Sequence, residues 1–153
     1  MTNQWEIKTG IGHMDLAAIH QFLQNDSYWA KGIDFELVKA SLENSFCIGV
    51  FLDNQQIGFA RVITDYTTFG WLADVFVLPA YRGRGISKAM MRFLTDLPWV
   101  GKLRRLMLST LDAHELYRGY GFKNLGNAAS MMEVHRPDVY LKPTTGEASA
   151  VSG

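Results

Sequence analysis

Residues 74–88 of this 153-residue chain read DVFVLPAYRGRGISK. An apolar run is followed by Pro79-Ala80-Tyr81, then by a basic loop with two glycines, and then by residues typical of the start of a helix. Gly83 and Gly85 would let the backbone come close to a ligand. The first turn of the helix would direct unpaired N–H groups and the positive end of its dipole at an anion. With Arg82, Arg84 and Lys88 nearby, this segment predicts a phosphate-binding site.

Length and composition indicate one globular domain. A chain of 153 residues that is 48% hydrophobic can bury a core without crosslinks. Fifteen basic residues balance fifteen acidic ones, which argues against a nucleic-acid partner. The single cysteine, Cys47, excludes a disulfide framework and a cysteine-based metal site, and we predict no metal site. The N-terminus lacks the apolar segment of a signal peptide, and no run of about 18 apolar residues exists, so we expect a cytoplasmic protein that does not contact membranes.

The hydrophobic pattern predicts an α+β fold, an α/β sandwich in which about four helices flank a mixed, twisted sheet of six to seven strands. Helical spacing favours helices over 16–24, 35–43, 85–97 and 113–118, the first two behind N-caps at Asp15 and Asp34. Apolar or alternating runs favour strands over 4–9, 46–52, 56–64, 71–78 and 103–110, with a final strand region from Phe122 and its partner over 130–134. We expect the domain to span 1–142, and the Ser, Ala, Gly and Thr-rich residues 143–153 to form a flexible tail.

Two common phosphate-binding motifs do not fit the glycine loop. A P-loop requires a glycine-lysine pair followed by serine or threonine, and the chain has no such pair after this loop. A dinucleotide fingerprint requires a third glycine where Lys88 stands, and an acidic residue about twenty residues further on, near a second strand. The nearest acid, Asp96, lies inside the predicted helix.

A third pattern fits the loop. RGRGIS, residues 82–87, resembles the Arg/Gln-x-x-Gly-x-Gly/Ala signature of the GNAT (Gcn5-related N-acetyltransferase) family. AHELYRGYGF, residues 113–122, resembles the later A-x-x-L-Y-x-x-x-G-F segment of the same family. Both stand in the family's order, with a predicted helix and strand between them. The chain departs from the pattern at Ser87, where the family prefers glycine or alanine, and at Thr110, where many members carry asparagine.

The resemblance implies direct transfer of an acetyl group from acetyl-CoA to an amine of a small molecule or a peptide. In the family, the loop signature holds the pyrophosphate of acetyl-CoA. The strand before it separates from its neighbour, and its backbone binds the pantetheine arm, with an N–H near Val77 as the expected oxyanion donor. Carried over to this chain, the implied cofactor-binding residues are Phe76, Val77, Leu78, Arg82, Gly83, Arg84, Gly85, Ile86, Ser87, Lys88 and Thr110.

Two residues are candidates for proton transfer. Tyr117 matches the family's general acid, which protonates the CoA thiolate, although a tyrosine there could also be a core residue. Asp74 lies among apolar neighbours, which suits a general base with a raised pKa. An equally weighted alternative makes Asp74 a structural carboxylate bonded to Arg61 or Tyr66, with ordered water as the base. The expected walls of the acceptor pocket are Tyr28, Trp29, Arg61 and Tyr66.

Two other functions stay open at this point, and the acceptor amine is not identified. One is a non-catalytic acyl-CoA-binding sensor on the same fold, which would bind acetyl-CoA without releasing its thiol. The other is an interaction protein, such as a homodimer, whose glycine loop binds a different phosphate ligand.

Overall fold

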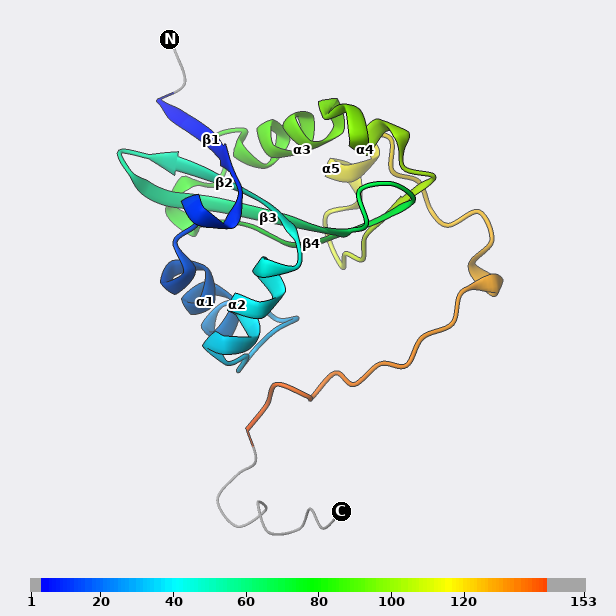
Figure 1. The fold of residues 1–153 in the computed structure, drawn as a ribbon, viewed down its shortest axis with the longest axis horizontal. Coiled ribbons are helices and arrows are strands. Elements are labelled where there is room, and N and C mark those ends of the chain that lie inside the picture. The colour runs from blue at the N-terminus through cyan, green and yellow to red at the C-terminus, as the bar shows by residue number, and fades with distance from the viewer. Residues whose placement is uncertain (1–3, 143–153) are drawn as a thin grey trace.

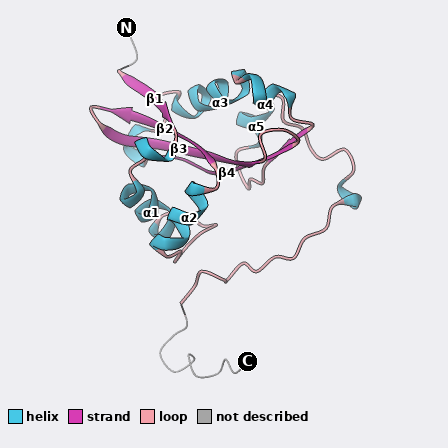
Figure 2. Cartoon of the chain, in the orientation of Figure 1, coloured by secondary structure: helices cyan, strands magenta, loops and turns pink. Residues whose placement is uncertain are grey.

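Helices cover both faces of one five-stranded sheet (Figure 1 and Figure 2). The structure is a computed structural model that describes residues 4–142, so the tail expected over 143–153 lies outside the described residues. The strands are β1 (Trp5–Thr9), β2 (Phe46–Leu52), β3 (Gln55–Thr64), β4 (Phe69–Val77) and β5 (Arg105–Met107). Helices α1 (Leu16–Asn25) and α2 (Phe35–Glu43) lie on one face, and α3 (Ile86–Asp96), α4 (Pro98–Lys102) and α5 (His114–Arg118) lie on the other.

The sheet is mixed, as predicted. Its strands lie side by side in chain order, antiparallel from β1 to β4, with β5 parallel to β4. The parallel pairing is short, because it joins only Phe69–Trp71 to Arg105–Met107. From Leu72 to Val77, β4 has no strand on that edge within residues 4–142.

A bulge interrupts the antiparallel pairing of β3 and β4. Phe59 pairs with Phe76 and Arg61 with Ala73, so Asp74 and Val75 both stand opposite Ala60. Asp74 adopts a φ of 55°, a left-handed conformation that is uncommon outside glycine but is tolerated by aspartate. An extra residue of this kind re-aims a side chain and increases local twist. The bulge therefore sets the direction of the Asp74 carboxylate.

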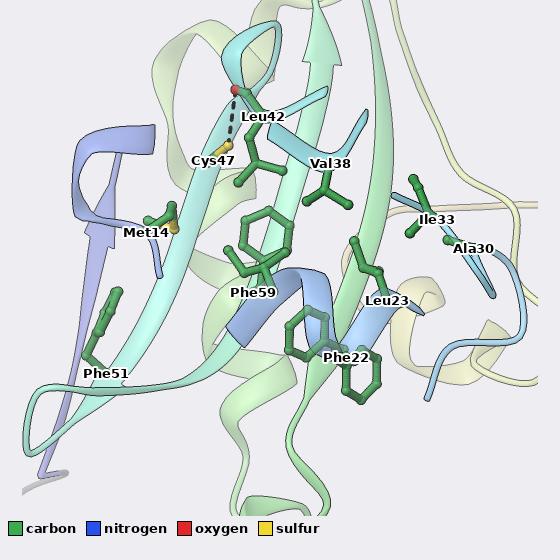
Figure 3. Close-up of a cluster of buried hydrophobic side chains, with 12 residues drawn as sticks. Met14, Phe22, Leu23, Ala30, Ile33, Val38, Leu42, Cys47, Phe51 and Phe59 are labelled. Atoms are coloured by element: carbon green, nitrogen blue, oxygen red, sulfur yellow. Dashed lines mark hydrogen bonds between the residues drawn. The ribbon is translucent and has the colours of Figure 1, made fainter. Parts of the chain in front are cut away.

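Two hydrophobic cores hold the helices to the sheet. Between the sheet and α1–α2, Phe59 and Phe76 pack with Phe22, whose ring stacks on that of Phe76 with centroids 4.0 Å apart. Figure 3 shows Phe59 and Phe22 in this core, with the Cys47 thiol directed at the carbonyl oxygen of Leu42. Burial raises the pKa of the Cys47 thiol to about 11, so this cysteine is a neutral core residue. The core on the other face is formed by β2–β4, α3 and α5.

The structure corrects four details of the sequence prediction. Residues 4–142 contain five strands rather than the six to seven expected, and five α-helices rather than about four. The expected strand over 103–110 shortens to β5, because Leu108–Thr110 separate from β4. Pro98 ends α3 as expected but also begins α4, since proline suits the first turn of a helix, where no N–H is needed.

The last correction concerns the chain after α5. No strand forms at Phe122 or over 130–134 within the described residues, and only a short 3-10 helix, Ala128–Ser130, interrupts this segment. Its apolar residues favour a strand, but a strand also needs a neighbouring strand with which to form hydrogen bonds. Within residues 4–142, no helix has the length and apolar character required to cross a lipid bilayer.

Candidate active site

The glycine loop between β4 and α3 faces open space. Gly83 and Gly85 have φ values of 78° and 82°, in the left-handed region that favours glycine. A Cβ atom placed on either residue would meet no other heavy atom within 4 Å. Gly85 is the N-cap of α3 and brings no side chain to the first turn of that helix. A ligand can therefore approach the backbone of this loop directly.

Six consecutive N–H groups, from Gly83 to Lys88, have no hydrogen-bond acceptor within the described part of the chain. They precede and begin an 11-residue helix, so the positive end of the helix dipole lies at the same place. Such a run of free amides is suited to binding an anion with several oxygens, as a pyrophosphate has. This observation supports the cofactor-binding role that the sequence predicts for the loop.

Basic side chains surround these amides. The Arg82 Nε donates to the carbonyl oxygen of Val77 at 3.0 Å, which ties the loop to the end of β4. The Arg84 guanidinium lies over the Tyr81 ring, 5.3 Å from its centroid, and Lys88 is exposed. The Ile86 side chain is buried in the core, so this residue can offer a ligand only its N–H group.

The open edge of β4 leads to the glycine loop. The Leu78 N–H donates to the Ile57 carbonyl on the β3 side at 2.8 Å. Because consecutive residues of a strand direct their backbone groups to opposite edges, the Val77 N–H faces the edge that β5 leaves free. Phe76 packs into the core between Phe22 and Phe59, and its backbone faces β3 as that of Leu78 does, so the structure does not offer these two predicted cofactor-binding residues at the free edge. An extended ligand could lie along this edge as an added strand.

Tyr117 lies on α5 and is 8% exposed. Burial raises the pKa of its phenol to about 12, and the nearby charges of Tyr28 and Asp112 add to the shift. Its hydroxyl has no hydrogen-bond partner from residues 4–142, and the side chain lines a cavity of about 430 Å³ beside β5. Thr110 lines the same cavity, but its Oγ1 accepts the Ala113 N–H at 3.1 Å at the start of α5.

Asp74 is held by two donors. Its Oδ2 accepts from Arg61 Nε at 2.6 Å, and its Oδ1 accepts from Trp29 Nε1 at 2.7 Å. The Arg61 and Asp74 side chains are only 13% and 9% exposed, so each charge depends on the other. The Arg61 Nη1 also donates to Ser45 Oγ at 2.9 Å. The structure thus contains the Arg61 pairing that the sequence analysis proposed as the structural role of Asp74.

A second cavity, of about 320 Å³, lies on the α1–α2 face of the sheet and has Asp74 in its wall. Its lining brings two expected pocket residues, Trp29 and Arg61, to the same place. The other lining residues are Ala30, Ile33, Leu37, Ser41, Ile63, Trp71, Ala73 and Tyr140. We call this space the Asp74 cavity.

The other two residues expected in the pocket lie elsewhere. Tyr28 is 59% exposed and packs edge-on against Trp29, with ring centroids 5.0 Å apart. Tyr66 packs on Trp99 at a centroid distance of 4.8 Å and lines neither cavity.

Tyr140 is a wall of the Asp74 cavity that the sequence analysis missed. A Cβ atom on Gly32 would lie only 2.6 Å from the Tyr140 carbonyl oxygen. Glycine at this position therefore lets the backbone of Tyr140 pack closely against it. Beyond it, Lys142 Nζ pairs with Asp34 Oδ1 at 2.7 Å. A short apolar run after Pro137, Val139 to Leu141, was the available signal.

Comparisons with known proteins agree with this geometry. Residues 16–122 match the model of the acetyltransferase (GNAT) family. A Gibberella zeae protein named as an acetyltransferase is 30% identical over 140 residues, which cover 78% of this chain and 77% of that protein.

Solved structures show the same fold. A Xanthomonas campestris protein assigned to the GNAT family is 43% identical, with a TM-score of 0.90 over 93% of this chain and 100% of that one. An acetyltransferase from Clostridium acetobutylicum, solved with acetyl-CoA, is 17% identical, with a TM-score of 0.63 over 86% of this chain and 96% of that one. The second likeness concerns the fold alone.

The ion pair between Arg61 and Asp74 generates a stability prediction. Asp74→Ala should lower the free energy of unfolding by about 3 kcal/mol, because it leaves a largely buried guanidinium without its carboxylate. The double variant with Arg61→Ala should lose less than the sum of the single variants. Urea denaturation of all four proteins measures the coupling. The exposed pair of Arg118 and Glu115 is a matched control and should show coupling close to zero, while equal coupling at both pairs would contradict the prediction.

Proposed function

Since this chain belongs to the GNAT acetyltransferase family, we propose that it is an N-acetyltransferase that moves the acetyl group of acetyl-CoA directly to an amine. The observation that carries the proposal is the run of six free N–H groups from Gly83 to Lys88, placed directly after a strand with an open edge. These two features together fit a ligand that has a pyrophosphate followed by an extended amide-containing arm. The acceptor is a small molecule or a peptide that reaches the Asp74 cavity.

The donor site follows from the backbone. The amides from Gly83 to Lys88, with Arg84 and Lys88 beside them, would bind the pyrophosphate. The free edge of β4 beside Val77 would bind the pantetheine arm, and the Val77 N–H would polarise the thioester carbonyl. When bound, acetyl-CoA supplies the acyl group as a thioester, whose carbonyl carbon an amine can attack.

Asp74 is the group placed to take the proton of the acceptor amine. Arg61 and Trp29 each use one acceptor site of its carboxylate, and an ionised carboxylate has about four such sites. The remaining sites can bind the amine or a water that relays its proton. Because both donors hold the carboxylate in place, Asp74 can stabilise the fold and also direct the acceptor within the Asp74 cavity.

Tyr117 is the group proposed to protonate the leaving sulfur. A buried phenol whose pKa is raised to about 12 is protonated at neutral pH and can donate that proton. In the proposed reaction, the amine nitrogen gives a proton to Asp74 or its water and forms a bond to the acetyl carbon. The carbon–sulfur bond breaks, and the sulfur takes the proton of Tyr117. After product release, Asp74 returns a proton to solvent while Tyr117 regains one from solvent.

Two measurements on the purified protein test the proposed function. Acetyl-CoA should raise the melting temperature, because it binds the folded state alone. A panel of small amines and peptides should then identify an acceptor that releases the CoA thiol. Stabilisation by acetyl-CoA without thiol release from any amine would replace this proposal with the acyl-CoA sensor. A well-folded sample that acetyl-CoA does not stabilise would remove both functions.

Replacing Tyr117 tests its role as an acid. Tyr117→Phe removes only the hydroxyl, so we expect kcat to fall about 10²-fold or more while the Kd of acetyl-CoA changes little. Since the phenol stays protonated below about pH 10, the wild-type pH profile should show no alkaline decline caused by this residue in that range. Tyr120→Phe on the same segment is the control. Unchanged turnover of Tyr117→Phe would remove the acid role.

Reversing one charge at the glycine loop tests the donor site. Arg84→Glu should weaken acetyl-CoA binding about tenfold or more, because it places a carboxylate beside the proposed pyrophosphate. S-acetylpantetheine lacks the pyrophosphate, so its steady-state KM should change far less. Arg92→Glu makes the same change at an exposed position further along α3 and should have little effect. Equal losses for both acyl donors would show that the loop does not bind the pyrophosphate.

A further inference from the structure

The Asp74 cavity has a polar end and an apolar end. Along β4 its lining runs from Trp71 to Asp74, at most about 10 Å, since a strand rises about 3.3 Å per residue. Ile63 of β3 stands opposite Trp71 in the strand pairing, at the end away from Asp74. Because β4 continues from Asp74 to Val77, the Asp74 end is the one closer to the proposed thioester site. A bound acceptor would therefore place its amino group at Asp74 and its body toward Trp71.

The charges in this cavity are already balanced. Within the described residues, Arg61 and Asp74 are the only charged ones that line it, and they form an ion pair at 2.6 Å. Arg61 also donates to Ser45, so a carboxylate on the acceptor would have to compete for a guanidinium that is already bound. A second ammonium group would find no carboxylate at the apolar end, and burying it there is costly. These charges favour an acceptor with one amino group and no carboxylate.

Three aromatic side chains from separate parts of the chain surround the rest of the cavity. Trp29 comes from the loop between α1 and α2, Trp71 from β4, and Tyr140 from the segment after α5. Leu37 and Ile63 also line the cavity and are 50% and 41% exposed, so its apolar wall reaches the molecular surface. Aromatic walls attract flat apolar groups, whereas the hydroxyl groups of a sugar would need hydrogen-bond partners there.

We propose that the acceptor is a primary monoamine whose amino group is joined by a short linker to one aromatic ring or a similar flat apolar body. The amino group would lie at Asp74, and the ring would lie against Trp71 and Ile63. A cavity of about 320 Å³ is small among ligand pockets and suits one ring rather than a peptide. This inference rests on the proposed function, because it names the acceptor of that reaction.

The apolar wall also suits the chemistry. Burial away from water disfavours the ammonium form of an amine, and the neutral form has the electron pair that attacks the thioester carbon. As the nitrogen–carbon bond forms and the carbon–sulfur bond breaks, one amine proton passes to Asp74 or its water. The sulfur leaves as the CoA thiol with the proton of Tyr117. The product is a neutral amide, which has lost its charge interaction with Asp74 and is therefore released more easily.

Matched pairs of acceptors test the proposal on the wild-type protein. Phenethylamine and phenylalanine differ by one carboxylate, and butylamine and putrescine differ by one amino group. In the thiol-release assay, kcat/KM should be about tenfold or more higher for the first member of each pair. Phenethylamine should also exceed butylamine, because its ring fills the aromatic end. Equal or better turnover of phenylalanine or putrescine, or no advantage of the ring, would overturn the proposal and leave the acetyltransferase function intact.

Binding without turnover separates this inference from the proposed function. Isothermal titration calorimetry with CoA in place of acetyl-CoA measures the affinity for each amine when no acetyl group is available. Phenethylamine should bind with a Kd about tenfold or more below that of phenylalanine. Selective binding without any thiol release in the kinetic assay would overturn the proposed reaction but keep the class of ligand. Absence of binding in calorimetry together with absence of turnover would overturn the class of ligand.

A carboxylate introduced into the apolar wall should change the preference. Leu37 lies in the first turn of α2, where the helix dipole favours a carboxylate, so Leu37→Glu should fold. We expect the ratio of kcat/KM for putrescine to that for butylamine to rise about tenfold or more. Ile63→Glu introduces the same charge from β3 and should act alike. Phe35→Glu, at an exposed position of α2 that does not line the cavity, is the control and should leave the ratio unchanged. The same ratio in all three variants would show that this wall does not select the acceptor, and would overturn the proposal.

Discussion

The early end of the pairing between β4 and β5 is the constraint on which the rest of the molecule depends. A parallel ladder that continued past Trp71 would occupy the backbone edge of β4 and leave no place for an extended ligand. Instead β4 runs on to Val77 with that edge free and passes directly into the glycine loop. The open edge and the free amides of α3 thus follow one another along the chain, in the order in which an arm and its pyrophosphate would need them.

A second constraint acts on the opposite face of the sheet, through the bulge at Asp74. The bulge aims the carboxylate at Arg61 and Trp29, so one side chain joins β3, β4 and the loop between α1 and α2. A guanidinium this deeply buried needs a carboxylate nearby, because an unpaired charge is costly away from water. The same interaction that stabilises the sheet therefore places an oriented carboxylate in the wall of the Asp74 cavity.

The segment after α5 connects these two faces. Its first residues line the cavity beside β5, and Tyr140 lines the Asp74 cavity. Residues 130–134 were predicted from the sequence as a strand, yet no strand pairs with them within residues 4–142. A segment can have a strong preference for the extended conformation, but it forms a strand only when another strand lies beside it. This part of the prediction was therefore wrong.

The sequence by itself determined the family, the mixed sheet, and the glycine loop at the start of α3. These features follow from local patterns: apolar periodicity, glycines at positions of positive φ, and two motifs at a fixed distance. Tertiary structure alone decided where β5 leaves β4, that Asp74 pairs with Arg61 and Trp29, that Tyr66 packs on Trp99, and that Tyr140 lines the Asp74 cavity. Each of these depends on residues far apart in the chain, and their contacts are set by register, bulge and packing, which no local pattern records.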